Sequence, residues 1–140
     1  MKPVPPQVIA SGPAGTVWYG GAVDRVKMSL RVHTTGDERD EVARLLGCAP
    51  ENRKRHWTIG APVAHDGGFD AQLSALLAKC TSDLSVWQNV ASRWKIDLFC
   101  GLFLERPNRG LSIGVEALQQ LTERGIELGF DIYSPDDEAL

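Results

Sequence analysis

Apolar and polar side chains alternate along three stretches of the chain, as they do in a strand that buries one face. The stretches are 25–34 (RVKMSLRVHT), 95–105 (KIDLFCGLFLE) and 126–134 (IELGFDIYS). In each of them the apolar residues share one face of the strand. Polar and aromatic residues occupy the other face. The alternation therefore predicts three half-buried strands.

Shorter segments also favour extended backbone. Residues 16–21 (TVWYGG) are rich in β-branched and aromatic types, and residues 56–63 (HWTIGAPV) reach a proline that fits an edge position or a strand end. Residues 110–113 (GLSI) follow the turn-forming sequence RPNRG. We expect 110–113 to pair back on 95–105 as a hairpin.

Helical periodicity predicts the remaining elements. Residues 37–47 (DERDEVARLLG) begin with acids, which the helix dipole favours, and end at a glycine. Residues 69–94 carry apolar side chains three or four positions apart, so they predict one long kinked helix or two short ones. In the second case Ser82 or Thr81 would cap the second helix.

The last helix is expected over residues 115–125 (VEALQQLTERG), with Val115, Leu118 and Leu121 facing inward. The resulting order is strand, helix, strand, one or two helices, hairpin, helix, strand. This order predicts an α+β two-layer sandwich, with a mostly antiparallel sheet and helices packed on one face, of ferredoxin-like or related type.

The chain divides into three parts by composition. Residues 1–15 are rich in proline and glycine, so they predict an extended or disordered N-terminal arm. Residues 16–134 are expected to form a single α+β domain. Residues 135–140 form an acidic tail.

Charge and cysteine usage narrow the function classes. The net charge of −3 gives no overall attraction to nucleic acid or to anionic membranes. No run approaches the roughly 20 apolar residues of a membrane span, and the N-terminus lacks a signal-peptide pattern. The three cysteines have no C-x-x-C spacing, which fits reduced thiols. We expect a cytoplasmic protein.

The sheet face turned away from the helices is the unusual surface. It mixes acids, bases and aromatic rings, and a solvated face with cross-strand ion pairs of roughly 0.2–1 kcal/mol each is one interpretation. Outward Phe99 and Phe103 favour a covered surface instead, under the Trp18–Tyr19 segment, a second subunit or another protein. The candidate interaction face comprises Arg31, His33, Asp97, Phe99, Phe103, Asp131 and Tyr133.

The same face allows a polar pocket. Asp97 and Asp131 would form a carboxylate pair for acid–base chemistry if their strands are neighbours, tuned by Arg31 and His33. A structural cluster of salt bridges is the alternative.

A basic loop stands out at NRKRHW, with Arg53, Lys54, Arg55 and Trp57. These residues could grip a phosphate backbone and stack a base, or bind an acidic protein patch. The acidic total disfavours nucleic acid, and a solvated loop is the plain alternative.

Motifs for other chemistry are missing from the sequence. His33, His56 and His65 are too dispersed for a metal motif, and there is neither a G-x-S-x-G elbow nor a phosphate-binding G-K-[ST] loop. We therefore predict no catalytic residue, no metal and no cofactor.

A set of segments resembles a known family. They run from SLRVHTTG through LLG, APENRKRHW, LSALLAKC and KIDLFCGLF to GLSIGVEALQQLTERGIELGFDIY, within residues 26–133. Together they resemble the bacterial domain-of-unknown-function family 4279. The resemblance implies no established activity and no catalytic residue. Some small bacterial domains of this kind act as immunity partners of toxins, which is an analogy.

Two functions follow as hypotheses. The first is a non-catalytic protein-interaction module, in one version an immunity-type partner of a toxin, that binds an unknown protein or a second copy through the outward face. The alternative is a small-molecule-binding protein or enzyme with a polar pocket on that face.

Overall fold

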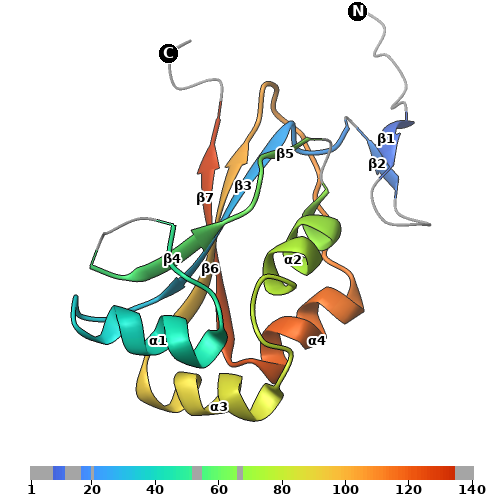
Figure 1. The fold of residues 1–140 in the computed structure, drawn as a ribbon. Coiled ribbons are helices and arrows are strands. Elements are labelled where there is room, and N and C mark those ends of the chain that lie inside the picture. The colour runs from blue at the N-terminus through green and yellow to red at the C-terminus, as the bar shows by residue number, and fades with distance from the viewer. Residues whose placement is uncertain (1–7, 12–16, 20, 52–54, 66–67, 135–140) are drawn as a thin grey trace, which may run out of the picture.

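The computed structural model describes residues 8–11, 17–19, 21–51, 55–65 and 68–134 (Figure 1). The elements in chain order are β1 (Val8–Ser11), β2 (Val17–Tyr19), β3 (Arg25–Val32), α1 (Glu38–Leu46), β4 (Trp57–Gly60), β5 (Ala64–His65), α2 (Phe69–Leu77), α3 (Leu84–Arg93), β6 (Ile96–Phe103), α4 (Val115–Glu123) and β7 (Ile126–Tyr133).

The main sheet has the strand order β4-β3-β6-β7, with β5 pairing along the same edge of β3 as β4. Pro62 lies between β4 and β5, in the edge position that its missing N–H favours. The pairings of β3 with β4, β5 and β6 are antiparallel, and β6 pairs with β7 in parallel. The predicted α+β sandwich with a mostly antiparallel sheet is therefore confirmed.

The predicted hairpin is wrong. Residues 110–113 contain no strand, and Gly110 makes only an isolated parallel bridge to Ala22. The position beside β6 belongs to β7, which matches it residue for residue from Ile96–Ile126 to Phe103–Tyr133. A full-length parallel ladder satisfies more backbone groups than a four-residue hairpin strand, and α4 supplies the crossover that parallel pairing requires.

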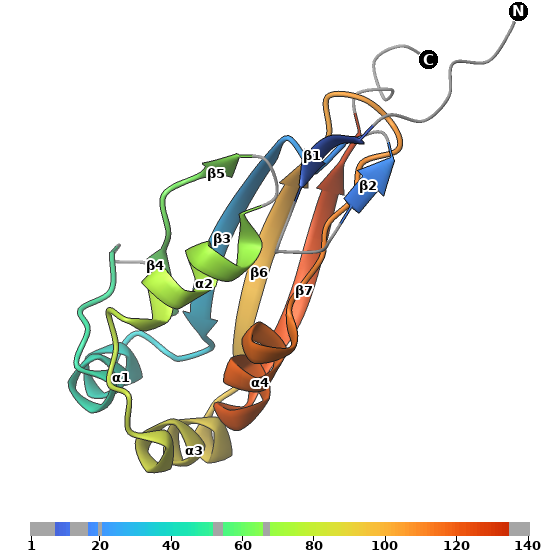
Figure 2. The same ribbon diagram turned by 90° about the vertical axis from the view of Figure 1, so that its right-hand side faces the viewer.

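Helices α2 and α4 lie over one face of the sheet, while α1 and α3 close its lower end (Figures 1 and 2). The core forms between these layers because the alternating strands turn their apolar residues toward the helices. On β3 these residues are fully buried: Val26, Met28, Leu30 and Val32. Trp57, Phe69 and Trp87 complete the same cluster from β4, α2 and α3.

Helix ends follow local chemistry. Gly47 ends α1 at φ 69°, a left-handed conformation that glycine adopts without steric cost. The predicted interruption of 69–94 gives two helices, α2 and α3. The cap of α3 is Asp83, whose Oδ1 accepts a 2.9 Å hydrogen bond from Ser85 N. The prediction of Ser82 or Thr81 as cap is wrong, because Asp83 holds the N-cap position and its carboxylate accepts from the amide of the second helical residue.

The helix layer covers β7 incompletely. Ile126 is buried, but Phe130 and Ile132 are 42% and 63% exposed although they lie on the helix side. Figure 2 shows that α4 covers only the first half of this edge strand. Val115 and Leu118, expected to face inward, are 81% and 45% exposed. Leu121 is buried as expected, and Ala117 completes the buried face of α4.

Strands β1 and β2 form a separate antiparallel pair. The pair lies on the helix side of the main sheet (Figures 1 and 2). The Trp18–Tyr19 segment is thus on the opposite side from Phe99 and Phe103. Within the described ranges no helix combines the length and apolar composition of a membrane span.

Candidate functional site

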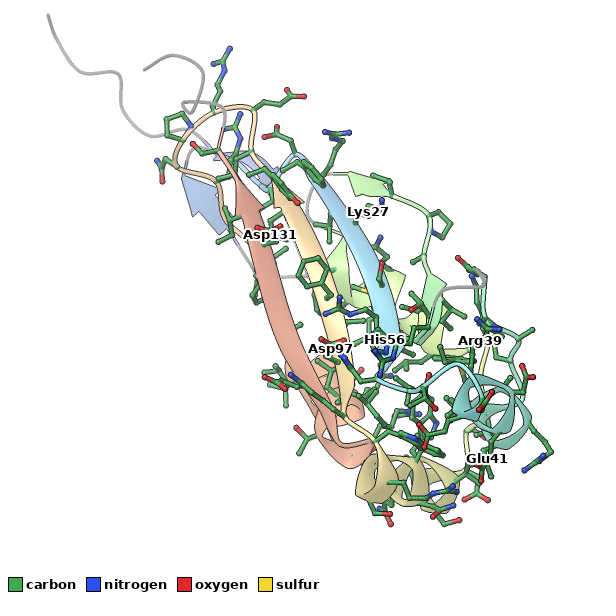
Figure 3. The ribbon with its side chains drawn as sticks, turned by 90° about the vertical axis from the view of Figure 1, so that its left-hand side faces the viewer. Lys27, Arg39, Glu41, His56, Asp97 and Asp131 are labelled. Atoms are coloured by element: carbon green, nitrogen blue, oxygen red, sulfur yellow. The ribbon has the colours of Figure 1, made fainter. Side chains whose placement is uncertain are left out.

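One face of β3, β6 and β7 carries no helix in the described part of the chain (Figure 3). We call this surface the helix-free face. It consists of Arg25, Lys27, Ser29 and Arg31 from β3, Asp97, Phe99, Gly101 and Phe103 from β6, and Glu127, Gly129, Asp131 and Tyr133 from β7. His33 continues the β3 row just beyond the strand. On the other side of β3, β4 adds Thr58 and Gly60, and His56 directly precedes β4.

Charge on the helix-free face is sorted by strand. The row on β3 is basic, the row on β7 is acidic, and the β6 row between them holds two phenylalanines, a glycine and one aspartate. The strand register sets which residues lie side by side: Asp97 is placed between Arg31 and Glu127, and Gly101 between Lys27 and Asp131. The face is therefore electrically polar across its width.

The expected cluster around Asp97 is present. Arg31 makes a bidentate ion pair with this carboxylate. Its Nε donates to Oδ1 at 2.8 Å, and its Nη2 donates to Oδ2 at 2.6 Å. His33 Nε2 lies 3.3 Å from Oδ2, in a contact too poorly aligned to satisfy this nitrogen as a hydrogen bond. The His33 and His56 rings are 4.8 Å apart.

The environment of Asp97 favours its charged form. Burial raises the pKa of this carboxyl, but Arg31, with a smaller contribution from His33, outweighs burial and holds the pKa below its usual value. Arg31 in turn has a raised pKa, chiefly because it donates to Asp97. The pair is a fixed ion pair, so Asp97 is a poor candidate for a general acid at neutral pH.

The two outward phenylalanines are partly covered by the chain itself. The Arg31 guanidinium lies 4.6 Å from the Phe99 ring centroid, and the Arg25 guanidinium lies 4.5 Å from that of Phe103. Phe103 also stacks on Tyr133, with ring centroids 4.6 Å apart. Tyr133 remains 47% exposed and is the most open aromatic ring of this set.

The register separates Asp97 from Asp131. Their strands are neighbours, but Asp131 pairs with Gly101, four positions along from Asp97 and therefore about 13 Å away. Asp131 instead accepts a 2.7 Å hydrogen bond from the Tyr133 hydroxyl, which raises the pKa of Tyr133. Acid–base work by an Asp97–Asp131 pair has no geometric support.

A pocket of about 660 Å³ lies over the paired strands β3 and β4 on the helix-free face. Its polar lining includes residues beyond the candidate set, namely Lys27, Ser29, Glu51, His56, Thr58 and Lys79. The alternation of 25–34 already places Lys27 and Ser29 on this face. Lys79 follows α2 and reaches the edge of β4, where its Nζ donates to Gly60 O at 3.0 Å. No pattern in the sequence predicts that Lys79 comes close to β4.

The basic loop is only partly described. Arg53 and Lys54 lie outside the described residues, and Arg55 is exposed. Trp57 is fully buried, and its indole Nε1–H donates to Cys48 O at 2.9 Å. Its ring faces the core, so it offers no surface on which a base could stack.

The thiols of two cysteines are poorly suited to nucleophilic chemistry. Burial raises the pKa of Cys80 to about 12, with Cys48 beside it adding to the effect, and burial likewise raises the pKa of Cys100 to about 12. All three cysteines are free. Among the residues that the structure describes, no three His, Cys, Asp or Glu side chains gather to hold a metal ion.

A family model described as "Domain of unknown function (DUF4279)" matches residues 24–135, which span the main sheet and all four helices. No curated protein and no solved structure shows significant similarity to the chain. The matched range includes every residue of the helix-free face and of the pocket. Its description names no activity.

Proposed function

Because the chain belongs to the DUF4279 family, which is described without a function, we propose from the site alone that it is a non-catalytic protein-interaction module. The helix-free face is the binding surface. The observation that carries this proposal is the sorting of charge across that face, from basic β3 to acidic β7, around half-buried aromatic rings. Complementary polarity of this kind fixes the orientation of a partner.

The partner follows from this polarity. It presents acidic side chains to Arg25 and Lys27 on β3, and basic side chains to Glu127 and Asp131 on β7. Tyr133 supplies an open aromatic ring at the β7 end, and aromatic anchors contribute strongly to protein interfaces. A toxin neutralised by an immunity-type partner is one specific version of this function.

We propose a non-catalytic role because the carboxylates and thiols considered for catalysis are poorly placed or poorly activated for it. Asp97 is occupied by Arg31, and Asp131 lies too far away to act with it. The thiols of Cys80 and Cys100 stay protonated at neutral pH. None of these groups is suited to moving protons at neutral pH, and the Asp97–Arg31 pair instead holds the helix-free face in shape.

The test is a pair of matched substitutions on opposite faces. Phe103→Asp changes the helix-free face, and Phe130→Asp makes the same change on the helix side of the neighbouring strand. Affinity capture from the native cell, read by mass spectrometry, identifies the partner with the unaltered chain as bait. We expect Phe103→Asp to lose that partner and Phe130→Asp to retain it, with thermal melts confirming that both variants fold.

Two results would contradict the proposal. One is an unchanged affinity of the captured partner for Phe103→Asp. The other is equal weakening by both substitutions, which would indicate a general loss of structure. The charge-sorted face also predicts that binding weakens steeply as salt rises, because opposite charges meet across the interface.

The pocket favours a second candidate, the binding of a small molecule on the same face. Its volume of about 660 Å³ lies within the range of ligand sites in proteins. The pocket is centred on the β3–β4 side near Arg31, and Asp131 is not part of its lining. Ligand-induced stabilisation should therefore depend on Arg31 and Lys27 rather than on Asp131.

A further inference from the structure

Most polar side chains that line the pocket over β3 and β4 are hydrogen-bond donors. Side-chain nitrogens come from two lysines, one arginine and one histidine, and hydroxyls come from one serine and one threonine. Phe99 provides an aromatic wall, and among the described residues of the lining Glu51 is the only carboxylate. A surface this rich in donors and poor in acceptors matches an oxyanion.

Arg31 is held ready for such a ligand. Asp97 occupies its Nε and Nη2, which fixes the plane of the guanidinium. Nη1 makes no hydrogen bond to any described residue, so its two protons remain available at the pocket. A donor that is already oriented loses little conformational freedom when a ligand binds.

Two further groups have unused capacity. Lys27 is exposed and has no ion-pair partner in the described part of the chain. His56 Nδ1 is buried, and no described atom hydrogen-bonds to it. Both residues line the pocket, and Figure 3 shows them on the same side of the sheet as Asp97. Because His56 Nδ1 has no solvent contact, a ligand would reach it only if the ring turned, so Lys27 is the stronger of these two groups for the assignment.

Lys79 and Glu51 form an ion pair at the edge of the pocket, and this pair affects where an anion can bind. Their ion pair spans 3.5 Å, and the two side chains are 42% and 51% exposed. Exposed pairs of this kind contribute little energy, but Glu51 still places a negative charge beside Lys79. Glu51 would then repel an anion bound deep at the β4 edge, which directs the charged group toward Lys27 and Arg31 instead.

We propose that this pocket binds a small organic molecule that carries a phosphate or carboxylate group. The oxyanion would lie over Ser29, midway along β3 between Lys27 and Arg31, where these two long side chains can reach it from either side, and an apolar part would lie against Phe99. This assignment gives a ligand class to the second candidate function and does not depend on the protein-interaction role. Ser29 and Thr58, which also line the pocket, are placed to donate to the remaining oxygens.

The experiment titrates the full chain with phenyl phosphate, benzoate and inorganic phosphate while backbone amides are followed by NMR. We expect shifts centred on Ser29, Thr58 and Gly60, with phenyl phosphate or benzoate binding more tightly than inorganic phosphate because of the Phe99 wall. The tighter of the two organic anions identifies the preferred head group.

A matched pair of lysine variants isolates the site. Lys27→Gln should weaken binding about tenfold, the typical effect of losing one charge-assisted hydrogen bond. Lys95→Gln removes the same charge from the surface pair with Glu127, away from the pocket, and should leave binding unchanged. Lys27→Arg should restore most of the affinity.

Two outcomes would overturn the assignment. The first is the absence of shifts at Ser29, Thr58 and Gly60 at millimolar ligand. The second is equal weakening by Lys27→Gln and Lys95→Gln, which would indicate general attraction of anions. Neither bears on partner capture, since Phe103 does not line the pocket, so the two proposals can fail separately.

Discussion

The two faces of β6 differ in what holds them, although their side chains alternate along one strand. Leu98 and Cys100 turn toward the helices and are fully buried. Phe99 and Asp97 turn the other way, and both are held by Arg31 from β3. Hydrophobic packing holds the side chains on the helix side, whereas an ion pair and a cation–π contact hold those on the helix-free face. The helix side therefore determines stability, while the helix-free face can serve recognition.

Truncating one residue on each face gives the largest expected contrast. Leu98→Ala should lower the free energy of unfolding by about 3 kcal/mol, because a fully buried leucine leaves a cavity. Phe99→Ala should cost only about 1 kcal/mol, since that ring is partly exposed and mainly loses its contact with Arg31. Urea denaturation measures both values, and equal losses would remove the distinction between the faces.

The Asp97 ion pair should have the next largest effect. Asp97→Asn should lower the free energy of unfolding by about 2 kcal/mol at neutral pH, because Arg31 loses a charged acceptor. The folded-state pKa of Asp97 is depressed, so its contribution is complete above the unfolded-state pKa of about 3.9 and is lost as pH falls through the folded value.

Urea denaturation at a series of pH values tests whether the stabilisation by Asp97 is lost on acidification. The stability difference between the unaltered chain and Asp97→Asn should be constant at neutral pH and should shrink below about pH 4. A difference that stays constant or grows on acidification would mean that the pair does not contribute in this way.

The smallest effect is expected at the exposed end of β7. Ile132→Thr should change the free energy of unfolding by less than about 0.5 kcal/mol, because the side chain is 63% exposed and threonine keeps the β-branch. Leu98→Ala in the same assay is the reference. A loss above 1 kcal/mol would show that the helix side of β7 is covered after all.

Alternation and periodicity in the sequence were sufficient for the four helices, the three long strands and the two-sided sheet, although the strand expected at 110–113 is absent. The alternation of 25–34 and 95–105 placed Arg31, His33 and Asp97 on one face, and the structure brings them into contact. Each of these inferences depends on local spacing, which the backbone geometry of a strand fixes.

Strand direction and register were not accessible from the same patterns. A period of two is identical for parallel and antiparallel pairing, so the sequence did not reveal the β6–α4–β7 crossover. Register then placed Asp131 opposite Gly101 rather than near Asp97. Trp57 was a different kind of miss: its neighbouring charges suggested exposure, although the local alternation of β4 buries it.

The most direct test of the account compares two adjacent residues of β3. Lys27 is exposed on the helix-free face, and Met28 is fully buried beneath the helices. A thiol reagent should label Lys27→Cys rapidly in the folded protein and label Met28→Cys only at the rate of global unfolding, with the native cysteines measured in parallel. Equal labelling rates, or faster labelling of Met28→Cys, would contradict the two-sided sheet on which both proposals depend.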